Sequence, residues 1–340
     1  MPSPAPTLRP AAAGDPTLGR IILAFLAVYL IWGSTYLAIR WAIETIPPFT
    51  MAGIRFLVAG SVLLVWARAR GVPAPTRGQV RDGVVVGALL LLGGNGAVVW
   101  AEQWVDSGLT ALLVATVPFW MVLLDWLWGD GLRPSVWAWI GIVWGLFGIW
   151  LLVGGGGFGV LEGQALVGGA VLLAGSMSWA LGSIHSRRAR IPAAPRMATA
   201  IQMLAGGVLL AAAGAVSGEW ARWDPSGTSL RSLLSLAYLI VFGGMVGYSA
   251  YIWLLRVSTP GRVATYAYVN PVVALFLGWL LAGEELGPRT LVAGTVILSA
   301  VVVLNRVSPP GRGRRGRAAA GPPAVVHAPV PRDGRGDGDP

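Results

Sequence analysis

The chain has 340 residues, of which 55% are apolar and 12% charged, and its mean hydropathy of +0.67 excludes an ordinary soluble globule and predicts an integral membrane protein. The absence of cysteine excludes disulfides and thiolate metal sites, and with only two histidines we expect neither a metal nor a cofactor. The net charge of +10 comes from arginines that lie mostly between apolar runs, where they orient helices rather than bind nucleic acid.

The N-terminal segment 1–19 lacks the order of charged, apolar and cleavage regions that an export signal has, and we expect a disordered cytoplasmic tail. Apolar runs long enough to span a bilayer follow, and they predict ten transmembrane helices. Their cores are 20–40, 49–67, 83–104, 108–128, 135–152, 164–185, 197–216, 232–255, 262–282 and 288–305. Segment 306–340 is rich in Pro, Gly and Arg and predicts a disordered basic tail, which touches anionic lipid rather than nucleic acid.

The distribution of arginines predicts the direction of the helices. If the N-terminus is cytoplasmic, the outward-facing arginines between helices are only Arg40, Arg222, Arg231 and Arg289. Cytoplasmic loops favour arginine, so this asymmetry places both termini in the cytoplasm. An even number of helices agrees with this placement.

The sequence also repeats itself. Leu91–Pro134 can be laid over Val241–Pro288 so that two Gly-Gly pairs and the prolines Pro118 and Pro271 coincide with small gaps. The two copies are the segments 20–152 and 163–305, and each holds five predicted helices. An odd number of helices makes the second copy enter the membrane from the opposite side, so we expect an all-α membrane protein of ten transmembrane helices in two inverted five-helix repeats. Such repeats are typical of transporters with a site near the midplane.

Two stretches carry a family resemblance. "AEQWVDSGLTALLVATVPFW" (Ala101–Trp120) and "TYAYVNPVVA" (Thr265–Ala274) resemble the EamA branch of the drug/metabolite transporter superfamily, and the likeness extends over about residues 20–305. The resemblance implies four helices of each half around a central cavity, with the fifth, here 135–152 or 288–305, at the periphery. It also implies export of small metabolites, amino acids or toxic compounds, without naming the cargo.

The predicted cavity residues begin with the two prolines. Pro118 and Pro271 fall near the middle of predicted helices, where each removes a backbone hydrogen bond and leaves a bend. Tyr266 and Asn270 lie four residues apart and share a helix face. We expect Tyr266, Asn270 and the bends to line the substrate path. The alternative is a packed kink whose tyrosine hydroxyls bond neighbouring helices.

Three charged residues are candidates for gating or coupling. Arg55 falls within a predicted helix, where an arginine costs roughly 2.5–3.5 kcal/mol on insertion scales, and Glu102 is its expected partner. The alternatives for Arg55 are a structural ion pair, snorkelling to the headgroups, or a gate or substrate contact. Glu102 or Asp125 could instead be the protonated group that couples export to a proton gradient.

Other polar and aromatic residues in apolar surroundings complete the set of cavity candidates. They are Ser34, Asn95, Ser183 and Gln202, together with Trp32, Trp100, Trp120 and Trp179. The polar ones can equally bridge helices, and tryptophan often anchors a helix at the membrane interface.

These features together predict a secondary transporter of the inner membrane that exports a small organic molecule by alternating access, with a proton gradient as a candidate driving force. An uptake carrier or a channel for small metabolites is an alternative, and a membrane-embedded enzyme is a weaker one, since no cluster of catalytic residues is found. The expected partners are a small-molecule substrate and membrane lipid, not nucleic acid. A homodimer is compatible with the sequence and stays open.

Overall fold

The computed structural model describes residues 17–128, 134–153, 161–190, 192, 194–258, 263 and 265–307. This described part of the chain is helical and contains no strand. The predicted disordered tails fall almost entirely outside it. We call the helices up to α8 the first half of the chain and those from α9 onward the second half.

The helices of the first half follow the predicted spans closely. They are α1 (Leu18–Leu26), the π-helical segment η1 (Ala27–Ile31), α2 (Trp32–Ala42), α3 (Pro48–Ala69), α4 (Arg77–Gly87), the π-helical segment η2 (Ala88–Asn95), α5 (Gly96–Ala101), α6 (Ser107–Val114), α7 (Val117–Trp128) and α8 (Val136–Val153). The segments α1, η1 and α2 form one continuous helical run, as do α4, η2 and α5.

The second half has a similar order of elements. They are α9 (Gln164–Arg188), α10 (Pro195–Val216), the short α11 (Glu219–Arg222) and a 3₁₀ turn η3 (Pro225–Gly227), then α12 (Leu230–Tyr238), the π-helical segment η4 (Leu239–Tyr248), α13 (Ser249–Val257), α15 (Tyr266–Ala282) and α16 (Pro288–Val307).

Seven helical runs in the described part of the chain are long and apolar enough to cross a membrane. They are Leu18–Ala42, Pro48–Ala69, Arg77–Ala101, Ser107–Leu124, Gln164–Ser186, Pro195–Val216 and Leu230–Leu254. Three shorter apolar helices, Val136–Leu151, Tyr266–Ala282 and Pro288–Val303, fall where the sequence predicts further spans.

Local sequence signals set several helix ends. Pro48 and Pro195 lie in the first turns of α3 and α10. An N–H at this position has no acceptor within the helix, so proline, which lacks the N–H, removes no hydrogen bond there. Thr76 and Gln79 form a reciprocal capping box at the start of α4. Gly283, with φ +67°, ends α15 in the left-handed conformation that glycine adopts without a steric penalty.

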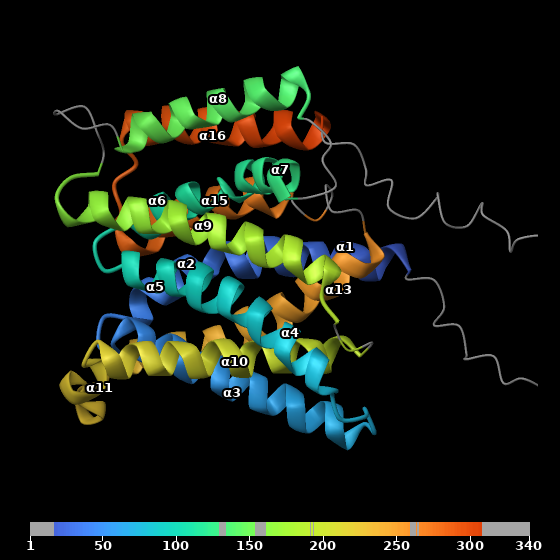
Figure 1. The fold of residues 1–340 in the computed structure, drawn as a ribbon. Coiled ribbons are helices and arrows are strands. Elements are labelled where there is room, and N and C mark those ends of the chain that lie inside the picture. The colour runs from blue at the N-terminus through green and yellow to red at the C-terminus, as the bar shows by residue number, and fades with distance from the viewer. Residues whose placement is uncertain are drawn as a thin grey trace, which may run out of the picture.

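The helices pack as a bundle whose opposite edges are helix pairs with one member from each half (Figure 1). One edge is α8 against α16, and the other is α3 against α10. Between them, α9 packs against η2, α5 and α7, while α15 packs against α2 and α6.

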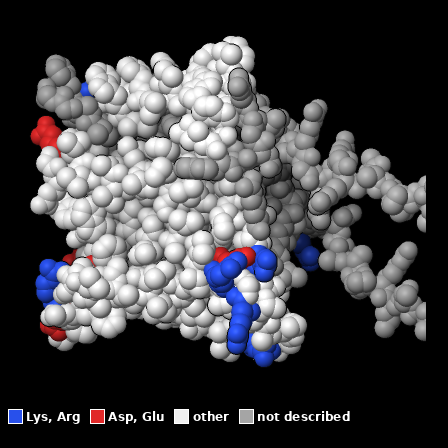
Figure 2. Space-filling view, in the orientation of Figure 1, with Lys and Arg blue, Asp and Glu red and all other residues white. Residues whose placement is uncertain are grey.

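The surface divides into two charged ends and an apolar middle. On the described part of the face in Figure 2, charged side chains gather at the two ends and leave the middle free of them. Large apolar side chains such as Val136, Trp137 and Trp150 on α8 are instead exposed on the outside of the bundle, which suits contact with lipid.

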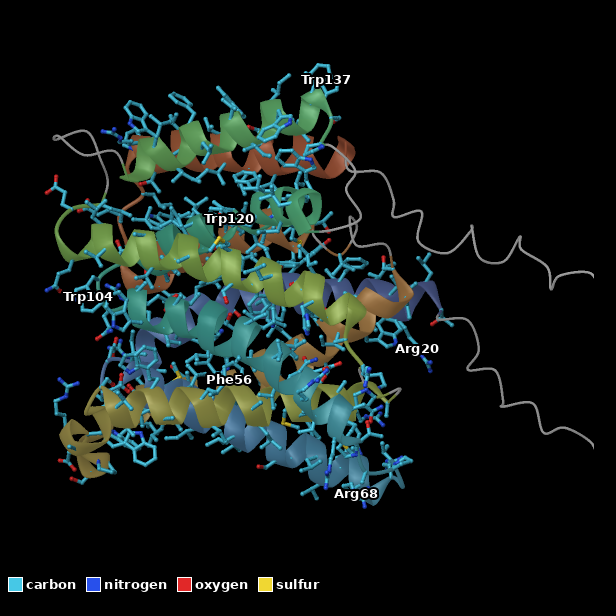
Figure 3. The ribbon with its side chains drawn as sticks, in the orientation of Figure 1. Arg20, Phe56, Arg68, Trp104, Trp120 and Trp137 are labelled. Atoms are coloured by element: carbon cyan, nitrogen blue, oxygen red, sulfur yellow. The ribbon has the colours of Figure 1, made fainter. Side chains whose placement is uncertain are left out.

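We name the two ends by their charges. The arginine end is the one at which Figure 3 labels Arg68, and the helix ends and loops there carry Arg68, Arg70, Arg77, Arg81, Arg190 and Arg196. The acidic end is the one at which Figure 3 labels Trp104, and the helix ends and loops there carry Glu44, Glu102, Asp106, Glu219 and Glu284. Figure 3 also shows Arg20 toward the arginine end.

Candidate functional site

A cavity lies in the middle of the bundle, with walls from both halves of the chain. It is lined by α2, α3, α5, α6, α7, α9 and α15 and by the π-helical segments η2 and η4. The cavity volume is about 80 Å³, smaller than that of most small-molecule sites, so the walls lie close together in this conformation. The polar and aromatic residues that line it are Trp32, Thr35, Tyr36, Arg55, Asn95, Ser176, Trp179, Tyr248, Tyr266 and Asn270.

One side of the cavity is aromatic. Trp32 lies at its centre, with ring centroids 5.0 Å from Tyr251, 5.5 Å from Tyr266 and 6.0 Å from Trp179. Tyr248 completes the group, 6.5 Å from Trp32. The contacts are edge-on or tilted, as aromatic quadrupoles favour. We call these five residues, Trp32, Trp179, Tyr248, Tyr251 and Tyr266, the aromatic wall; all but Tyr251 line the cavity.

Two π-helical segments bring opposite halves together beside the cavity. A π-helical turn disturbs the regular i to i−4 bonding, so some of its carbonyls are available to other donors. In η2 the carbonyl of Leu89 accepts from Ser178 Oγ of α9 at 2.8 Å. In η4 the carbonyl of Gly243 accepts from Trp32 Nε1 of α2 at 3.3 Å. Each π-helical segment is therefore bonded to a helix of the other half.

Glycines in these segments make room for cavity residues. A Cβ atom on Gly94 in η2 would lie 2.7 Å from Cε3 of Trp179. A Cβ atom on Gly243 in η4 would lie 2.8 Å from Nη2 of Arg55. A side chain at Gly94 or Gly243 would therefore collide with Trp179 or Arg55, which is a steric reason for one glycine in each of the repeated Gly-Gly pairs.

Arg55 is the charged residue of the described cavity wall. It lies on α3 with 4% of its surface exposed, and its guanidinium lies over the ring of Phe56, 4.8 Å from the centroid. Its Nε and Nη1 atoms are buried and have no hydrogen-bond partner. A buried charge without a hydrogen-bond partner is unfavourable, so an acceptor that bonds to Nε and Nη1 of Arg55 would stabilise the site.

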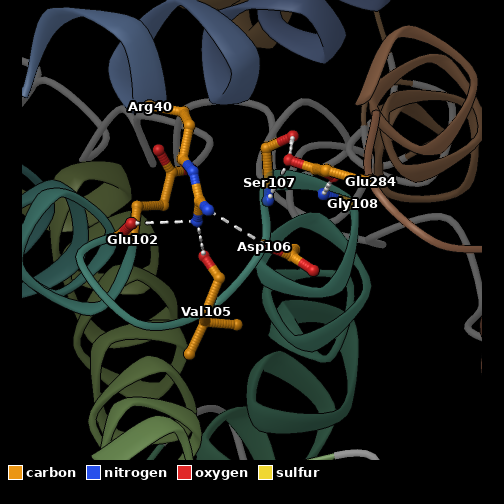
Figure 4. A network of polar contacts seen from close by, with 7 residues as sticks. All are labelled: Arg40, Glu102, Val105, Asp106, Ser107, Gly108 and Glu284. Carbon is orange, nitrogen blue, oxygen red and sulfur yellow. Dashed lines mark hydrogen bonds and ion pairs between the residues drawn. The ribbon is translucent and has the colours of Figure 1, made fainter. Parts of the chain in front are cut away.

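A network of polar contacts around Arg40 lies at the acidic end and joins α2 to the loop between α5 and α6 (Figure 4). Arg40 Nη2 pairs with Asp106 at 3.3 Å, and Nη1 donates to the carbonyls of Glu102 and Val105, also at 3.3 Å. Burial raises the pKa of Asp106, and the carboxylate of Glu284 raises it further, while Arg40 lowers it.

Glu284 caps the N-terminus of α6 from the other half of the chain. Its Oε1 accepts from the N–H and the hydroxyl of Ser107 at 2.9 and 2.7 Å, and its Oε2 accepts from the N–H of Gly108 at 3.1 Å. A carboxylate at a helix N-terminus both satisfies free N–H groups and complements the helix dipole. This contact links the loop after α15 to α6 (Figure 4).

A second carboxylate makes a similar link at the same end. Glu219 follows α10 and accepts from the N–H groups of Phe49 and Thr50 at 3.2 and 2.8 Å, and from the Thr50 hydroxyl at 2.9 Å. It therefore caps α3, whose preceding residue is a proline without a side-chain acceptor. The ion pair of Glu44 with Arg231 adds a further contact between the halves.

Six of the residues predicted from the sequence meet in the cavity wall. They are Trp32, Arg55, Asn95, Trp179, Tyr266 and Asn270. The carboxamide of Asn270 also faces the carbonyls of Tyr29 and Tyr266 at 3.1 and 3.3 Å, and with its nitrogen on that side it donates to both. Asn270 thus lines the cavity and holds α15 against η1.

The polar candidates Ser34, Ser183 and Gln202 lie outside the cavity lining and bond within the bundle. Ser34 Oγ donates to the carbonyl of Ile31 and pairs with the hydroxyl of Tyr238. Ser183 donates to the carbonyl of Trp179, and Gln202 accepts from the hydroxyl of Tyr248 at 2.6 Å. Gln202 therefore supports the aromatic wall from behind.

The tryptophan candidates Trp100 and Trp120 are also outside the lining. Trp100 packs edge-on against Trp104, with centroids 4.7 Å apart, and borders a separate, more open hollow. Trp120 packs beside a small cluster formed by Val117, Leu124 and Ala180, with its indole N–H buried and without a partner.

Pro118 disrupts its predicted span as expected, but as a break rather than as a bend within one helix. The span 108–128 is interrupted at Ala115 and Thr116: α6 ends at Val114, whose carbonyl would accept the hydrogen bond that Pro118 cannot donate, and Pro118 lies in the first turn of α7. Pro271 does lie inside α15. Neither proline lines the cavity.

The expected ion pair of Arg55 with Glu102 is also not formed. Both carboxylate oxygens of Glu102 are buried without a hydrogen-bond partner, as are two nitrogens of Arg55. The physical reason is position: Glu102 follows the end of α5 at the acidic end, beside Arg40, whereas Arg55 faces the cavity. Asp125 belongs to α7, but its side chain falls outside the described residues.

The sequence-based set missed Thr35, Tyr36, Ser176 and Tyr248 as cavity residues. A helical spacing could have identified two of them. Thr35 and Tyr36 lie three and four residues after Trp32, on the same helix face.

Comparisons with known proteins add to this geometry. A family model described as the EamA-like transporter family matches residues 19–154 and again 166–306. "Uncharacterized inner membrane transporter YedA" of Escherichia coli (strain K12) is 43% identical over 282 residues, covering 83% of this chain and 89% of that protein. "Uncharacterized transporter YoaV" of Bacillus subtilis (strain 168) is 25% identical, covering 84% and 96%. A crystal structure with 21% identity and a TM-score of 0.59 covers 84% of this chain and 96% of its own, and shows a shared fold.

Proposed function

We propose, since the chain belongs to the EamA-like transporter family, that it exports a small organic molecule through the central cavity by alternating access. It is a multi-pass transporter of the inner membrane. The observation that carries the mechanism is the position of the cavity, which is walled by both halves of the chain. Movement of one half against the other would open it to one side at a time.

The proposed architecture is ten transmembrane helices in two inverted halves, 20–152 and 163–305. The double match of one family model supports two copies of one unit. Equivalent helices also pack on each other, α3 on α10 and α8 on α16. The contacts of α9 with η2 and α7 correspond to those of α2 with α12 and α15, as an exchange of the two halves requires.

We propose that the arginine end faces the cytoplasm, together with both termini. At that end arginines outnumber carboxylates, whereas the acidic end balances Arg40 and Arg231 with Asp106 and Glu44. Excess arginine is typical of the cytoplasmic side. On this orientation, the contacts of Glu219 and Glu284 between the halves close the cavity toward the outside.

The absence of cysteine from the chain allows a clean test of this orientation. Ala74→Cys in the loop at the arginine end and Ser226→Cys at the acidic end are both exposed positions. In intact cells a membrane-impermeant maleimide should label Ser226→Cys alone, and labelling of Ala74→Cys should require open membranes. Labelling of both positions in intact cells, or of Ala74→Cys alone, would contradict the proposed topology.

Transport itself is tested in two stages. Growth of cells that express the chain is compared with that of cells without it, in the presence of amino acids, analogues and drugs, because an exporter confers resistance to its own cargo. The compound found is then loaded into proteoliposomes with the purified chain. A carrier should give saturable flux that the same compound on the opposite side accelerates. Flux that rises linearly without this acceleration would indicate a channel, and greater sensitivity of expressing cells would indicate uptake.

A further inference from the structure

We propose that Arg55 is the substrate-recognition group of the cavity and that the substrate is an organic monoanion, a carboxylate with a flat apolar body. This inference rests on the proposed transport function and specifies its substrate class. Three observations carry it: the state of the Arg55 guanidinium, the net charge of the cavity lining, and the division of the cavity into an aromatic and a polar side.

The guanidinium of Arg55 is buried in the cavity wall, but the wall does not supply hydrogen-bond acceptors for all of its nitrogens. The side chain is 4% exposed, is fixed over Phe56, and has Nε and Nη1 without partners. Nη2 lies 2.8 Å from the position that a Cβ atom on Gly243 would take, so the guanidinium has room there only because residue 243 is glycine. Unpaired nitrogens of a planar guanidinium suit a carboxylate, which can accept two parallel hydrogen bonds.

The charge of the lining selects a monoanion. Among the described lining residues Arg55 is charged and no aspartate or glutamate is present. Glu102, which lies near enough to interact electrostatically with Arg55, forms no ion pair with it. A bound monoanion therefore neutralises the site, whereas a zwitterion leaves its ammonium group without a carboxylate partner and the site with a net positive charge.

The remaining lining defines the body of the substrate. The aromatic wall offers ring faces and edges on which a flat apolar group can stack. Asn95 Oδ1 and Ser176 Oγ are buried in the lining without partners, so they can accept hydrogen bonds from a neutral N–H or O–H of the substrate. An acid with an aromatic body and an uncharged amide N–H matches all three features.

Three small molecules with one common body test the inference. N-acetyl-L-phenylalanine is a monoanion, N-acetyl-L-phenylalaninamide is neutral, and L-phenylalanine is a zwitterion. Binding of each to the full chain in lipid nanodiscs is measured by isothermal titration calorimetry. We expect the monoanion to bind at least 10-fold more tightly than either of the others. Equal binding of the amide, tighter binding of the zwitterion, or no binding of the monoanion overturns the inference.

Variants on one helix give the matched control. Arg55→Gln should lose the preference for the monoanion over the amide, and Arg55→Lys should keep part of it because the charge remains. Arg68→Gln makes the same substitution at an exposed position of the same helix and should leave the preference unchanged. If Arg55→Gln does not fold, the comparison of the three probes on the unchanged chain and on Arg55→Lys still decides the question.

Failure of this inference can be told apart from failure of the transport proposal. Counterflow of a neutral or zwitterionic compound that persists in Arg55→Gln would overturn the anion inference and keep the carrier. Binding of the monoanion through Arg55 without any counterflow would support the anion site and contradict the carrier.

Discussion

Glu284 joins the two halves of the chain at the acidic end, and its removal should make the cavity accessible from that end. Its carboxylate accepts three hydrogen bonds from Ser107 and Gly108 at the start of α6. In Glu284→Ala these donors lose their acceptor. The contact joins both halves, so it exists only while this end is closed. Loss of these hydrogen bonds therefore destabilises the closed conformation more than the open one.

The size of the effect follows from the chemistry of the contact. Loss of an N-cap acceptor costs about 0.5–2 kcal/mol, and loss of a charge that complements the helix dipole costs about 0.3–1 kcal/mol. Relief of the repulsion between Glu284 and Asp106, which raises the pKa of Asp106, offsets part of this. A net shift of about 1–2 kcal/mol changes the ratio of closed to open conformations by about 5- to 30-fold.

A buried reporter measures this ratio. Ser176 lines the cavity and is 2% exposed, so Ser176→Cys in this otherwise cysteine-free chain should react slowly with an impermeant maleimide in intact cells. We expect Glu284→Ala to accelerate the reaction by about 5- to 30-fold, in proportion to the open population. The neighbouring Glu285 is exposed, and Glu285→Ala is the matched control. Equal reaction rates in the two variants would refute the role of Glu284 in closing this end.

Three further outcomes test other parts of the structure. Gly94→Ala places a methyl group 2.7 Å from the ring of Trp179, so the thermal denaturation of the purified chain should show a loss of about 1–3 kcal/mol; an unchanged midpoint would contradict this close packing. Glu219→Ala removes the cap of α3 and should cost about 0.5–2 kcal/mol in the same assay, unlike Glu285→Ala, which removes an exposed carboxylate at the same end. Because folding raises the pKa of Asp106, its ionisation opposes folding. The stability of the unchanged chain relative to Asp106→Asn should therefore fall as the pH rises from acidic to neutral, and a rise would contradict the sign of the shift.

The positions of the helices were predictable because their signals are local. Predicted cores 49–67 and 197–216 lie inside α3 and α10, since apolar length and a proline in the first turn need no knowledge of the rest of the chain. The interruption between α6 and α7 also has a local signal, because Pro118 cannot donate a hydrogen bond to the carbonyl of Val114, where α6 ends. The sequence does not indicate that this proline comes with a full break in the helix, whereas α15 continues through Pro271.

The caps of the helices show the same limit more clearly. A local rule assigns Asp106 as the N-cap of α6, because an aspartate directly precedes the helix. In the structure Asp106 makes no side-chain cap and pairs with Arg40, while Glu284 takes its place. Glu284 is 177 residues from Ser107 in the sequence, and no pattern within one segment indicates such a contact.

The cavity was predictable in part for a related reason. Tyr266 and Asn270 share one face by helical spacing, and Arg55 was conspicuous because an arginine in an apolar helix needs a partner. The choice of Glu102 as that partner depended on depth in the membrane alone. Depth can be counted along the sequence, but the sideways position of a residue in the bundle depends on how the helices pack, and that places Arg40 beside Glu102 instead.

The carboxylates at the acidic end are hydrogen-bonded, whereas Arg55 in the cavity is not, and this difference bears on transport. Carboxylates at the acidic end accept hydrogen bonds from helix N-termini of the other half. Water can replace these bonds when the halves separate, so this end can open at a small cost in free energy. A buried ion pair at the centre would behave differently, since breaking one costs about 3–5 kcal/mol. Nε and Nη1 of Arg55 have no such partner, and the proposed anionic substrate would supply one. A ligand shifts a conformational equilibrium only by its difference in affinity for the two states, and an unpaired charge inside the cavity is the group whose environment changes most when the ligand enters.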